Sequence, residues 1–583
     1  MLISLLECQG VAEVVDNCAE AFFNLSMLRK NRRDIYGSGV NGQMTRMLDI
    51  GGPQSRAHTL LMVGNLLGNN LLQDKMMRED ILNTIIGLLV PSQREQCLAA
   101  AFVVSHLSHS YGAAKVMVFQ CDVVPKALEL LANHKENKMD VHAVGYLWTA
   151  LANLAHHSDF FFRMMEEKNL CVTLSEEASG GDQQDIVAQL MLNLSEHPEL
   201  HDLVGEKVFA KVVLSFKTLF IRGDTPDIRK TAISILINLA VCIAESRSLI
   251  LGTDLVDILE ESGLEDPALN HKFITLLYLI SCEAALCPKL VDFGVQRMLM
   301  SVVKSLTDEG KDIIAAILHN LSLKRALLGT GVLAALVGFL RNCKSTRVLW
   351  VSRAIANMSS YPRSRAILAK EKKLVPYLSG IMRTGSQEAD RVQHYCALSI
   401  CNIFSAHLDK TIIESLIKTG TVVDLVVVTL LRVNSMHTKG ALGKALFNLL
   451  ARADFREELV RLDVLEALIE LSRIELTELL ELSVKSVYNI SCETGRYAAK
   501  LEKLRVPHHM IARTILNPEL QGTRATTQVK LTCGKAIANM SFDAQLARAM
   551  THEKVCGWSR RGVCLACRYV TWCALSNVDR GGL

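Results

Sequence analysis

Aromatic residues are scarce in this sequence: Phe, Trp and Tyr make up 5% of its 583 residues, although half of the residues are hydrophobic. A core with so few rings must be filled mainly by Leu, Ile, Val and Ala, which is typical of helices stacked in layers. The length alone would suggest about four domains of ~150 residues. An array of repeats can form one continuous structure of this length, because each unit contacts only its neighbours.

An excess of charge of one sign is also missing. The chain has 64 Lys and Arg against 60 Asp and Glu, whereas proteins that bind nucleic acid usually carry a clear basic excess. The longest uncharged apolar run, residues 326–340, has 15 residues and is shorter than the ~20 that span a membrane. Residues 1–6 are apolar but lack the basic start of a secretory signal. We therefore expect no nucleic-acid partner, no membrane span and no secretory signal.

Catalytic signatures are absent: there is no Walker A motif, no His-Glu-x-x-His, no Gly-x-Ser-x-Gly and no protein-kinase set. A literal Gly-x-Gly-x-x-Gly occurs at Gly37, Gly39 and Gly42. A dinucleotide site needs a strand before this motif, but a helical pattern precedes it here, so we interpret it as a turn. We expect a protein that is not an enzyme and that has no cofactor, no metal and no small-molecule substrate.

Paired cysteine knuckles are missing as well, although the chain has 17 Cys. Most of them, such as Cys97 and Cys401, lie in apolar helical patterns, where a thiol behaves as a small hydrophobe. His106 and His109 lie one helical turn apart without further ligands at metal spacing, and we interpret them as histidines at the solvent edge. The cysteine usage indicates a reducing compartment, so we expect a cytoplasmic protein, with the nucleus and the cytoskeleton as further locations.

One short pattern recurs along the chain: an apolar segment that closes on Asn-Leu-Ser or a close variant. Successive anchors of this pattern are 37 to 50 residues apart, and a period of about 40–47 residues is typical of HEAT and armadillo repeats. The thirteen anchors are Asn24, Asn65, His106, Asn153, Asn193, Asn238, Leu279, Asn320, Asn357, Asn402, Asn448, Asn489 and Asn539.

The unit resembles the armadillo repeat, whose third helix ends on Ala-Leu-x-Asn-Leu-Ala/Ser. Residues 354–359, 445–450 and 536–541 match this helix end, and residues 121–131 and 418–426 match the turn and second helix that follow it. The resemblance covers roughly residues 1–548. It implies an all-α fold, a right-handed α-solenoid of about thirteen armadillo repeats.

The resemblance divides the chain into three parts. Residues 1–26 resemble an incomplete first repeat that lacks its first helix. Residues 27–548 are expected to form the solenoid of armadillo repeats. Residues 549–583 form a Cys-rich and Arg-rich tail that we expect to be disordered. Two polar inserts, residues 132–138 and 176–185, are expected to be surface loops, because insertions in solenoids fall in loops.

Third helices line the concave surface in armadillo proteins, so the resemblance implies a groove with a row of Asn side chains. Each amide offers one acceptor and two donors and could hold the backbone of an extended peptide. The other interpretation is that these Asn side chains tie neighbouring repeats together. The predicted groove residues of this kind are Asn320, Asn357, Asn402, Asn448, Asn489 and Asn539.

The position four residues before each Asn is one helical turn away on the same face. In importin-α this position is typically Trp, which no repeat of this chain has. The last five repeats instead have four bases there, which is similar to the basic groove of β-catenin and implies acidic ligands. The bases are Arg353, Lys444, Lys485 and Lys535, with Leu398 at the remaining position.

The leading hypothesis is therefore a non-enzymatic scaffold or adaptor that binds extended protein segments in a concave groove, with acidic ligands in its C-terminal half. Two alternatives stay open: a nuclear transport receptor for basic cargo, and a structural component of a cytoskeletal or axonemal assembly. The missing Trp–Asn pairs argue against the transport receptor.

Overall fold

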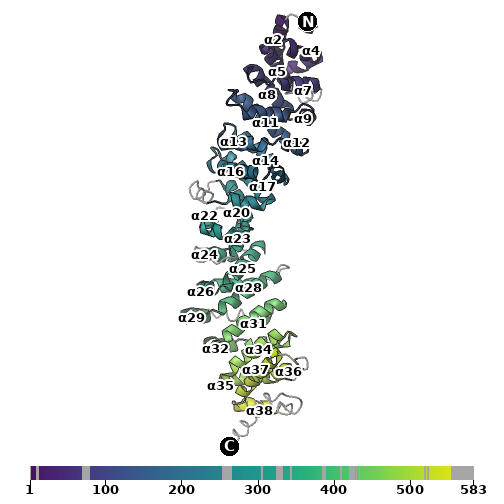
Figure 1. Ribbon diagram of the computed structural model, residues 1–583. Helices are drawn as coiled ribbons and strands as arrows, with labels where there is room; N and C mark the ends of the chain where they lie inside the picture. The colour runs from purple at the N-terminus through teal and green to yellow at the C-terminus, as the bar shows by residue number, and fades with distance from the viewer. Residues whose placement is uncertain are drawn as a thin grey trace. The chain divides into compact units, whose positions relative to one another are not determined.

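The computed structural model describes residues 2–7, 12–67, 79–252, 266–303, 306–322, 332–341, 345–383, 389–406, 410–418, 427, 430–431, 433–515, 517, 520 and 524–552. These residues form helices joined by turns, and no strand occurs among them. The chain divides into two compact units, Met1–Leu286 and Cys287–Leu583, which we call the N-terminal and C-terminal units. Within each unit the helices are stacked in chain order (Figure 1).

The predicted anchors all lie near the end of a helix, one to four residues before its last residue. This confirms the prediction of a repeated helical unit. In the N-terminal unit these third helices are α2 (Ala12–Ser26), α5 (Pro53–Leu67), α8 (Arg94–Leu107), α11 (Val141–Ala155), α14 (Gln184–Ser195), α17 (Pro226–Cys242) and α20 (Pro267–Ser281). In the C-terminal unit they are α23 (Asp308–Ser322), α25 (Ser345–Ser360), α28 (Ala389–Phe404), α31 (Met436–Leu450), α34 (Thr477–Ser491) and α37 (Arg524–Met540).

The remaining helices fill the first and second places of the repeats. First-place helices are α3 (Arg32–Gly37), α9 (Tyr111–Phe119), α12 (Phe161–Met165), α15 (Leu200–Val204), α18 (Ala244–Ile250), α21 (Cys287–Asp292), α26 (Pro362–Lys370), α29 (Lys410–Lys418), α32 (Ala453–Arg461), α35 (Thr494–Lys503) and α38 (Ala544–His552). The 3₁₀ turns η1 (Arg29–Asn31) and η2 (Ser158–Phe160) precede α3 and α12. Second-place helices are α1 (Leu2–Glu7), α4 (Asn41–Ile50), α7 (Glu79–Gly87), α10 (Val123–Ala132), α13 (Leu170–Gly180), α16 (Glu206–Arg222), α22 (Val295–Val302), α24 (Val332–Arg341), α27 (Leu374–Arg383), α33 (Val464–Arg473) and α36 (Val506–Thr514).

Each third helix packs against the third helices of the repeats before and after it within its unit. The sequence dictates this packing, because small and aliphatic residues recur every three or four positions and cover more than half of the helix circumference. In α11, for example, Ala143, Leu147, Leu151 and Leu154 are fully or almost fully buried. Burial of this kind contributes about 25 cal/mol per Å² of apolar surface, so the packing of third helices stabilises each unit.

Several helices begin at proline. Proline has no backbone N–H, but the N–H groups of the first turn have no partner within the helix, so no hydrogen bond is lost there. Pro226 and Pro267 start α17 and α20, and Pro362 starts α26. Side chains cap the free amides beside two of them: Thr225 accepts a hydrogen bond from the Ile228 N–H, and Asp266 from the Ala268 N–H. Proline and these caps therefore define the residues at which these helices begin.

The predicted turns are in part confirmed. Gly37, Gly39 and Gly42 lie at the turn between α3 and α4, and Gly39 has a φ of 89°, which favours glycine. Residues 133–138 form a turn after α10, as expected. The prediction of a loop over residues 176–185 is wrong, because α13 continues to Gly180 and α14 begins at Gln184. The Glu177 carboxylate is buried and accepts a hydrogen bond from the Gln183 N–H, 3.1 Å away, which closes the helix end.

The two ends of the predicted solenoid differ from each other. At the N-terminal end, residues 2–7 and 12–26 form the helix pair α1 and α2, which pack together. At the C-terminal end, α38 runs to His552 and packs against α35, so the helical part reaches a few residues into the predicted tail. Residues 553–583 lie outside the described part of the chain.

Candidate functional site

Five successive third helices of the C-terminal unit share one solvent-exposed face. On α25, α28, α31, α34 and α37 this face holds the predicted Asn and the residue one turn before it. We call it the third-helix stripe and define it by Asn357, Asn402, Asn448, Asn489 and Asn539 with Arg353, Leu398, Lys444, Lys485 and Lys535. Asn320 on α23 is half-buried, while its neighbours Ala316 and His319 are buried.

The four predicted bases have different surroundings. Arg353 is exposed, and its guanidinium carbon lies 5.8 Å from the centre of the Tyr395 ring. Lys444 and Lys535 are exposed and have no ion-pair partner among the residues that the structure describes. Lys485 forms an ion pair with Glu481 of its own helix, with 2.5 Å between Nζ and Oε1. The stripe therefore carries less free positive charge than the sequence predicts.

Four of the five Asn side chains of the stripe donate a hydrogen bond to the repeat before them. Asn357 Nδ2 donates a hydrogen bond to Ser322 Oγ, and Asn402 Nδ2 to Ser359 Oγ, each over 3.1 Å. Asn539 Nδ2 donates likewise to Ser491 Oγ. The same bond occurs in the N-terminal unit at Asn65, Asn153 and Asn238. We call these bonds the Asn–Ser ladder.

The acceptor of each ladder bond is the Ser two residues after the preceding anchor, which is Asn in every case except His106, before Ser108. This Ser also donates its own proton to a carbonyl one turn back in its helix, as Ser322 does to His319 and Ser359 to Ala356. The hydroxyl is thus held as an acceptor toward the next repeat. The Asn side chains thus tie neighbouring repeats through Nδ2. They could also hold the backbone of a peptide through Oδ1, because within the described residues no donor reaches the Oδ1 atoms of Asn357, Asn402 and Asn539.

The ladder changes where the preceding motif lacks Ser. Asn448 follows Asn402-Ile-Phe404 and donates to the Cys401 carbonyl over 3.4 Å instead. Asn489 follows Asn448-Leu-Leu450 and makes no ladder bond among the described residues. Asn489 is therefore a natural control for the other positions.

We expect the substitution Asn357→Ala to reduce stability by about 1 kcal/mol, because a hydrogen bond to a half-buried partner contributes roughly that much. The substitution Asn489→Ala should cost less than half of this loss. Hydrogen exchange of the amides in α25 and α34 measures both effects locally. Equal losses at the two positions would show that the ladder bond does not stabilise the stack.

A second recurring contact joins the repeats: an Arg of a first helix that binds the end of the preceding third helix. Arg32, Arg365 and Arg456 each lie eight residues after an anchor, and their Nε atoms donate to the carbonyls of Ser26, Ser359 and Leu450. A cation at a helix C-terminus is favourable because it faces unpaired carbonyls. Sequence reasoning missed these arginines, although their fixed offset from the anchors was a usable signal.

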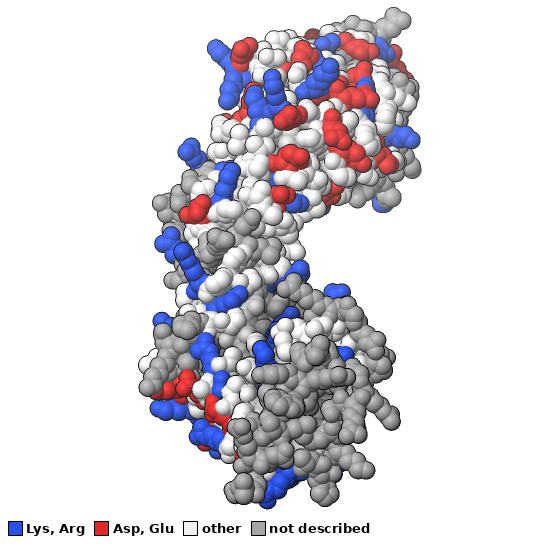
Figure 2. All heavy atoms as spheres, turned by 60° about the horizontal axis from the view of Figure 1, so that its bottom comes forward, with Lys and Arg blue, Asp and Glu red and all other residues white. Residues whose placement is uncertain are grey.

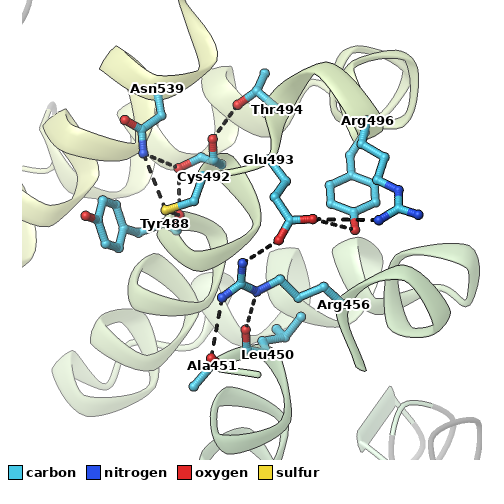
Figure 3. A network of polar contacts seen from close by, with 11 residues as sticks. Leu450, Ala451, Arg456, Tyr488, Cys492, Glu493, Thr494, Arg496 and Asn539 are labelled. Carbon is cyan, nitrogen blue, oxygen red and sulfur yellow. Dashed lines mark hydrogen bonds and ion pairs between the residues drawn. The ribbon is translucent and has the colours of Figure 1, made fainter. Parts of the chain in front are cut away.

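The contacts of Arg456 include an ion pair (Figure 3). Its Nη1 atom forms an ion pair with Glu493 Oε1 over 2.6 Å, while Nη2 reaches the Ala451 carbonyl. Glu493 also lies 4.0 Å from Arg496. One side chain therefore joins the end of α31 to the residues that follow α34.

Two aromatic residues on the same face were missed by the sequence analysis. Trp350 and Tyr395 lie seven residues before Asn357 and Asn402, and both are half-buried. Trp350 is 5.2 Å from the ring of His319, and Tyr395 lies under Arg353. Trp350 lies two helical turns before Asn357, one turn further back than the position at which importin-α typically has Trp.

His319 is buried beside Trp350, and its Nδ1 lies 3.1 Å from Asn320 Oδ1. Burial, with a contribution from the charge of Arg353, lowers the pKa of His319 to about 4. The unfolded chain has the ordinary histidine pKa of about 6.5. Between these values protons bind to the unfolded state and not to the folded state, so stability is lost as the pH falls from about 6.5 toward 4.

We expect this loss to reach about 2 kcal/mol at pH 5, as follows from the two pKa values. The melting temperature of the variant His319→Phe should fall less between pH 7 and pH 5 than that of the unsubstituted protein. Other histidines titrate equally in both proteins and cancel in the comparison. An identical drop in both would mean that His319 titrates normally in the folded state.

Within the described ranges no group of three or more His, Cys, Asp or Glu side chains could hold a metal ion. No helix of the described residues is both long enough and apolar enough to cross a membrane. Figure 2 shows one face of the molecule, on which both Lys or Arg and Asp or Glu side chains lie among uncharged residues.

Known proteins provide a comparison for the fold. No protein-family model matches this chain, and no curated protein sequence matches it. A structure solved for the interaction between cadherin and beta-catenin is similar over 93% of this chain and 99% of its own, at 14% identity and a TM-score of 0.52. An engineered protein is similar over 71% of this chain and 99% of its own, at 19% identity and a TM-score of 0.50. The likeness concerns the fold alone, and with the three-helix repeats and their anchors it shows that the chain has an armadillo-type repeat fold, an all-α solenoid.

Proposed function

We propose that this chain is a non-enzymatic scaffold that binds an extended acidic segment of a partner protein along the third-helix stripe. The observation that carries the proposal is the recurrence of exposed or half-buried bases one turn before half-buried Asn side chains on successive third helices. Asn Oδ1 atoms would accept hydrogen bonds from the backbone of the segment. Arg353, Lys444 and Lys535 would pair with its carboxylates, and Lys485 would do so in competition with Glu481.

The charges of the stripe support an acidic ligand over a basic one. A segment rich in Lys or Arg would meet Arg353, Lys444 and Lys535 at close range, and unpaired like charges oppose binding. The spacing fits an extended chain, because adjacent helices pack ~8–10 Å apart and three extended residues span about 10 Å. The fold also resembles a structure solved for the interaction between cadherin and beta-catenin. It is the groove of beta-catenin with which we compare the third-helix stripe.

The aromatic residues add a contact of another kind. Trp350 and Tyr395 would flank the backbone of the segment at the first two helices of the stripe, and Arg353 between them would hold a carboxylate. We therefore place an apolar residue next to an acidic one at that end of the bound segment. A cytoplasmic location of the scaffold belongs to this proposal and rests on the cysteine usage alone.

The test is a titration of the full chain with two unstructured 20-residue peptides of equal length, one with Glu and one with Lys at every third position. We expect the Glu peptide to bind and its affinity to fall as salt shortens the Debye length from about 30 Å at 0.01 M to 8 Å at 0.15 M. Tighter binding of the Lys peptide, or an affinity that does not respond to salt, would contradict the proposal.

A further inference from the structure

A row of exposed apolar side chains lies on three successive first helices of the N-terminal unit. Tyr111 and Phe119 of α9 are 47% and 50% exposed, Phe162 of α12 is 56% exposed, and Leu203 of α15 is 46% exposed. Helix α9 packs against α12, and α12 packs against α15. We call these four residues the aromatic ridge. It belongs to the first helices, whereas the stripe that we propose as the peptide groove belongs to third helices of the other unit.

The ridge is rigid because buried rings support it from below. Phe160, which is fully buried, stacks on Tyr111 at a centroid distance of 5.6 Å and an angle of 13°, and Phe119 meets its edge at 5.9 Å. Phe161 is equally buried and lies between Phe162, at 5.3 Å, and His197, at 4.0 Å. The space under the exposed rings is therefore already filled, and they cannot withdraw into the core.

A hydrogen bond fixes the ring at one end of the ridge. Tyr111 donates its hydroxyl proton to Asp159 Oδ2 over 2.8 Å. This bond and the nearby carboxylate charge raise the pKa of Tyr111, so the phenol keeps its proton. Large apolar residues occur singly on most protein surfaces, but rings held outward on adjacent helices form a preformed contact surface.

The sequence around α12 and α15 is acidic: from Asp159 to Glu206 it has eleven Asp or Glu and two bases, Arg163 and Lys168. On α9 the exposed Lys115 lies between Tyr111 and Phe119. Arg163 already forms ion pairs with Asp122 and Glu166. Glu199 and Asp202, beside Leu203, are exposed, and the side chain of Asp202 is 88% exposed. A partner that covers the ridge would therefore meet Lys115 at α9 and the exposed carboxylates of Glu199 and Asp202, which we call the acidic rim, at α15.

From this combination we infer that the aromatic ridge is a second docking surface, which binds a basic amphipathic helix of a partner protein. The apolar side of such a helix would cover Tyr111, Phe119, Phe162 and Leu203, and its Lys and Arg residues would reach the acidic rim. Three adjacent helices span about 20 Å between the outer axes, and a helix of about 13 residues has this length.

The acidic rim also decides between classes of ligand. Anionic lipid surfaces attract basic segments, and nucleic acid presents a dense row of phosphates, so both would be repelled by this rim. A basic helix is the ligand that gains from the rings and from the carboxylates together. The inference is independent of the proposed peptide groove, because the two surfaces share no residue.

The test uses a synthetic 18-residue helix with Leu and Trp on one face and Lys on the other, and a second version with Glu in place of Lys. Binding to the full chain is followed by fluorescence anisotropy at low salt. We expect the Lys helix to bind at least tenfold tighter than the Glu helix. The double variant Phe119→Ala/Phe162→Ala should weaken the Lys helix at least tenfold, and Glu199→Gln/Asp202→Asn should weaken it several-fold.

Two controls separate this surface from others. Leu214→Ala removes a similarly exposed side chain from α16 of the same unit and should leave binding unchanged. Replacing Lys444, Lys485 and Lys535 with Glu should not weaken the Lys helix either, since these residues belong to the groove. Unchanged binding in both test variants, or equal binding of the Glu helix or of vesicles with anionic lipid, would overturn the inference. Because Glu199 and Asp202 lie at the surface, their variant remains decisive even if the double Phe variant folds poorly.

Discussion

The triple variant Lys444→Glu/Lys485→Glu/Lys535→Glu is expected to bind an acidic extended peptide about 100-fold more weakly than the unsubstituted protein. An exposed charge contact contributes about 0.2–1 kcal/mol, and reversal replaces each attraction with a repulsion. A change of about 1 kcal/mol at each of three positions gives about 3 kcal/mol, and every 1.4 kcal/mol is tenfold in Kd. Titration calorimetry at two salt concentrations measures the loss.

Stability should change little in this variant, because exposed charges contribute little to folding. The largest local effect is expected in α34, where a Glu at position 485 would lie one turn from Glu481 and repel it by a few tenths of a kcal/mol. The matched control is Lys370→Glu/Lys372→Glu/Lys503→Glu, which changes the net charge equally at exposed sites outside the stripe. A similar loss of affinity in the control would show that the ligand senses net charge and not the stripe.

Arg347→Ala is expected to destabilise the stack around α23 and α25 more than any other single substitution considered for this protein. Arg347 is 3% exposed, and its Nε lies 2.5 Å from Asp312 Oδ1 on α23. Its Nη2 donates to the Asp308 carbonyl over 2.9 Å, and its guanidinium lies over the Phe339 ring. Removal of one partner of a buried pair costs about 3–5 kcal/mol. Since both aspartates retain contact with water, we expect about 2–3 kcal/mol here.

Two variants help to interpret this loss. Arg347→Met keeps the apolar stem against Phe339 and removes the charge, so its loss reports the ion pairs and the helix-end bond alone. Arg353→Ala, six residues later and exposed, should change stability by less than about 0.5 kcal/mol. Hydrogen exchange in α23 and α25 is the measurement. If Arg347→Ala and Arg353→Ala gave the same small change, the buried pair would not contribute to the stack.

The repeat and its third helices could be predicted because the information is local. Each anchor closes an apolar run with helical spacing, and the same face of each third helix recurs with the period of the chain. Arg353 and Lys444 were found in this way, by counting one turn back from Asn357 and Asn448. Their exposure follows from the helical period once the Asn is known to face outward.

Contacts between distant residues could not be predicted in this way. A tie between neighbouring repeats was one of the two interpretations of the Asn row, but no local pattern identifies Ser322, 35 residues before Asn357, as the acceptor. Glu177 shows the same limit. Its polar neighbourhood predicted a loop, but its buried carboxylate accepts a hydrogen bond from the backbone N–H of Gln183 at the end of the helix. A side chain at position 181 would collide with this carboxylate. The ion pair of Lys485 was missed for another reason, since Glu481 lies four residues before it and this spacing favours a helical ion pair.

The missing ladder bond at Asn489 also says how the C-terminal unit would respond to mechanical tension. In an array coupled through nearest neighbours, the weakest junction separates first. Between α31 and α34 no such bond occurs among the described residues, whereas α23 and α25, α25 and α28, and α34 and α37 are joined by one. We therefore expect the C-terminal unit to part first between α31 and α34 when its two ends are pulled.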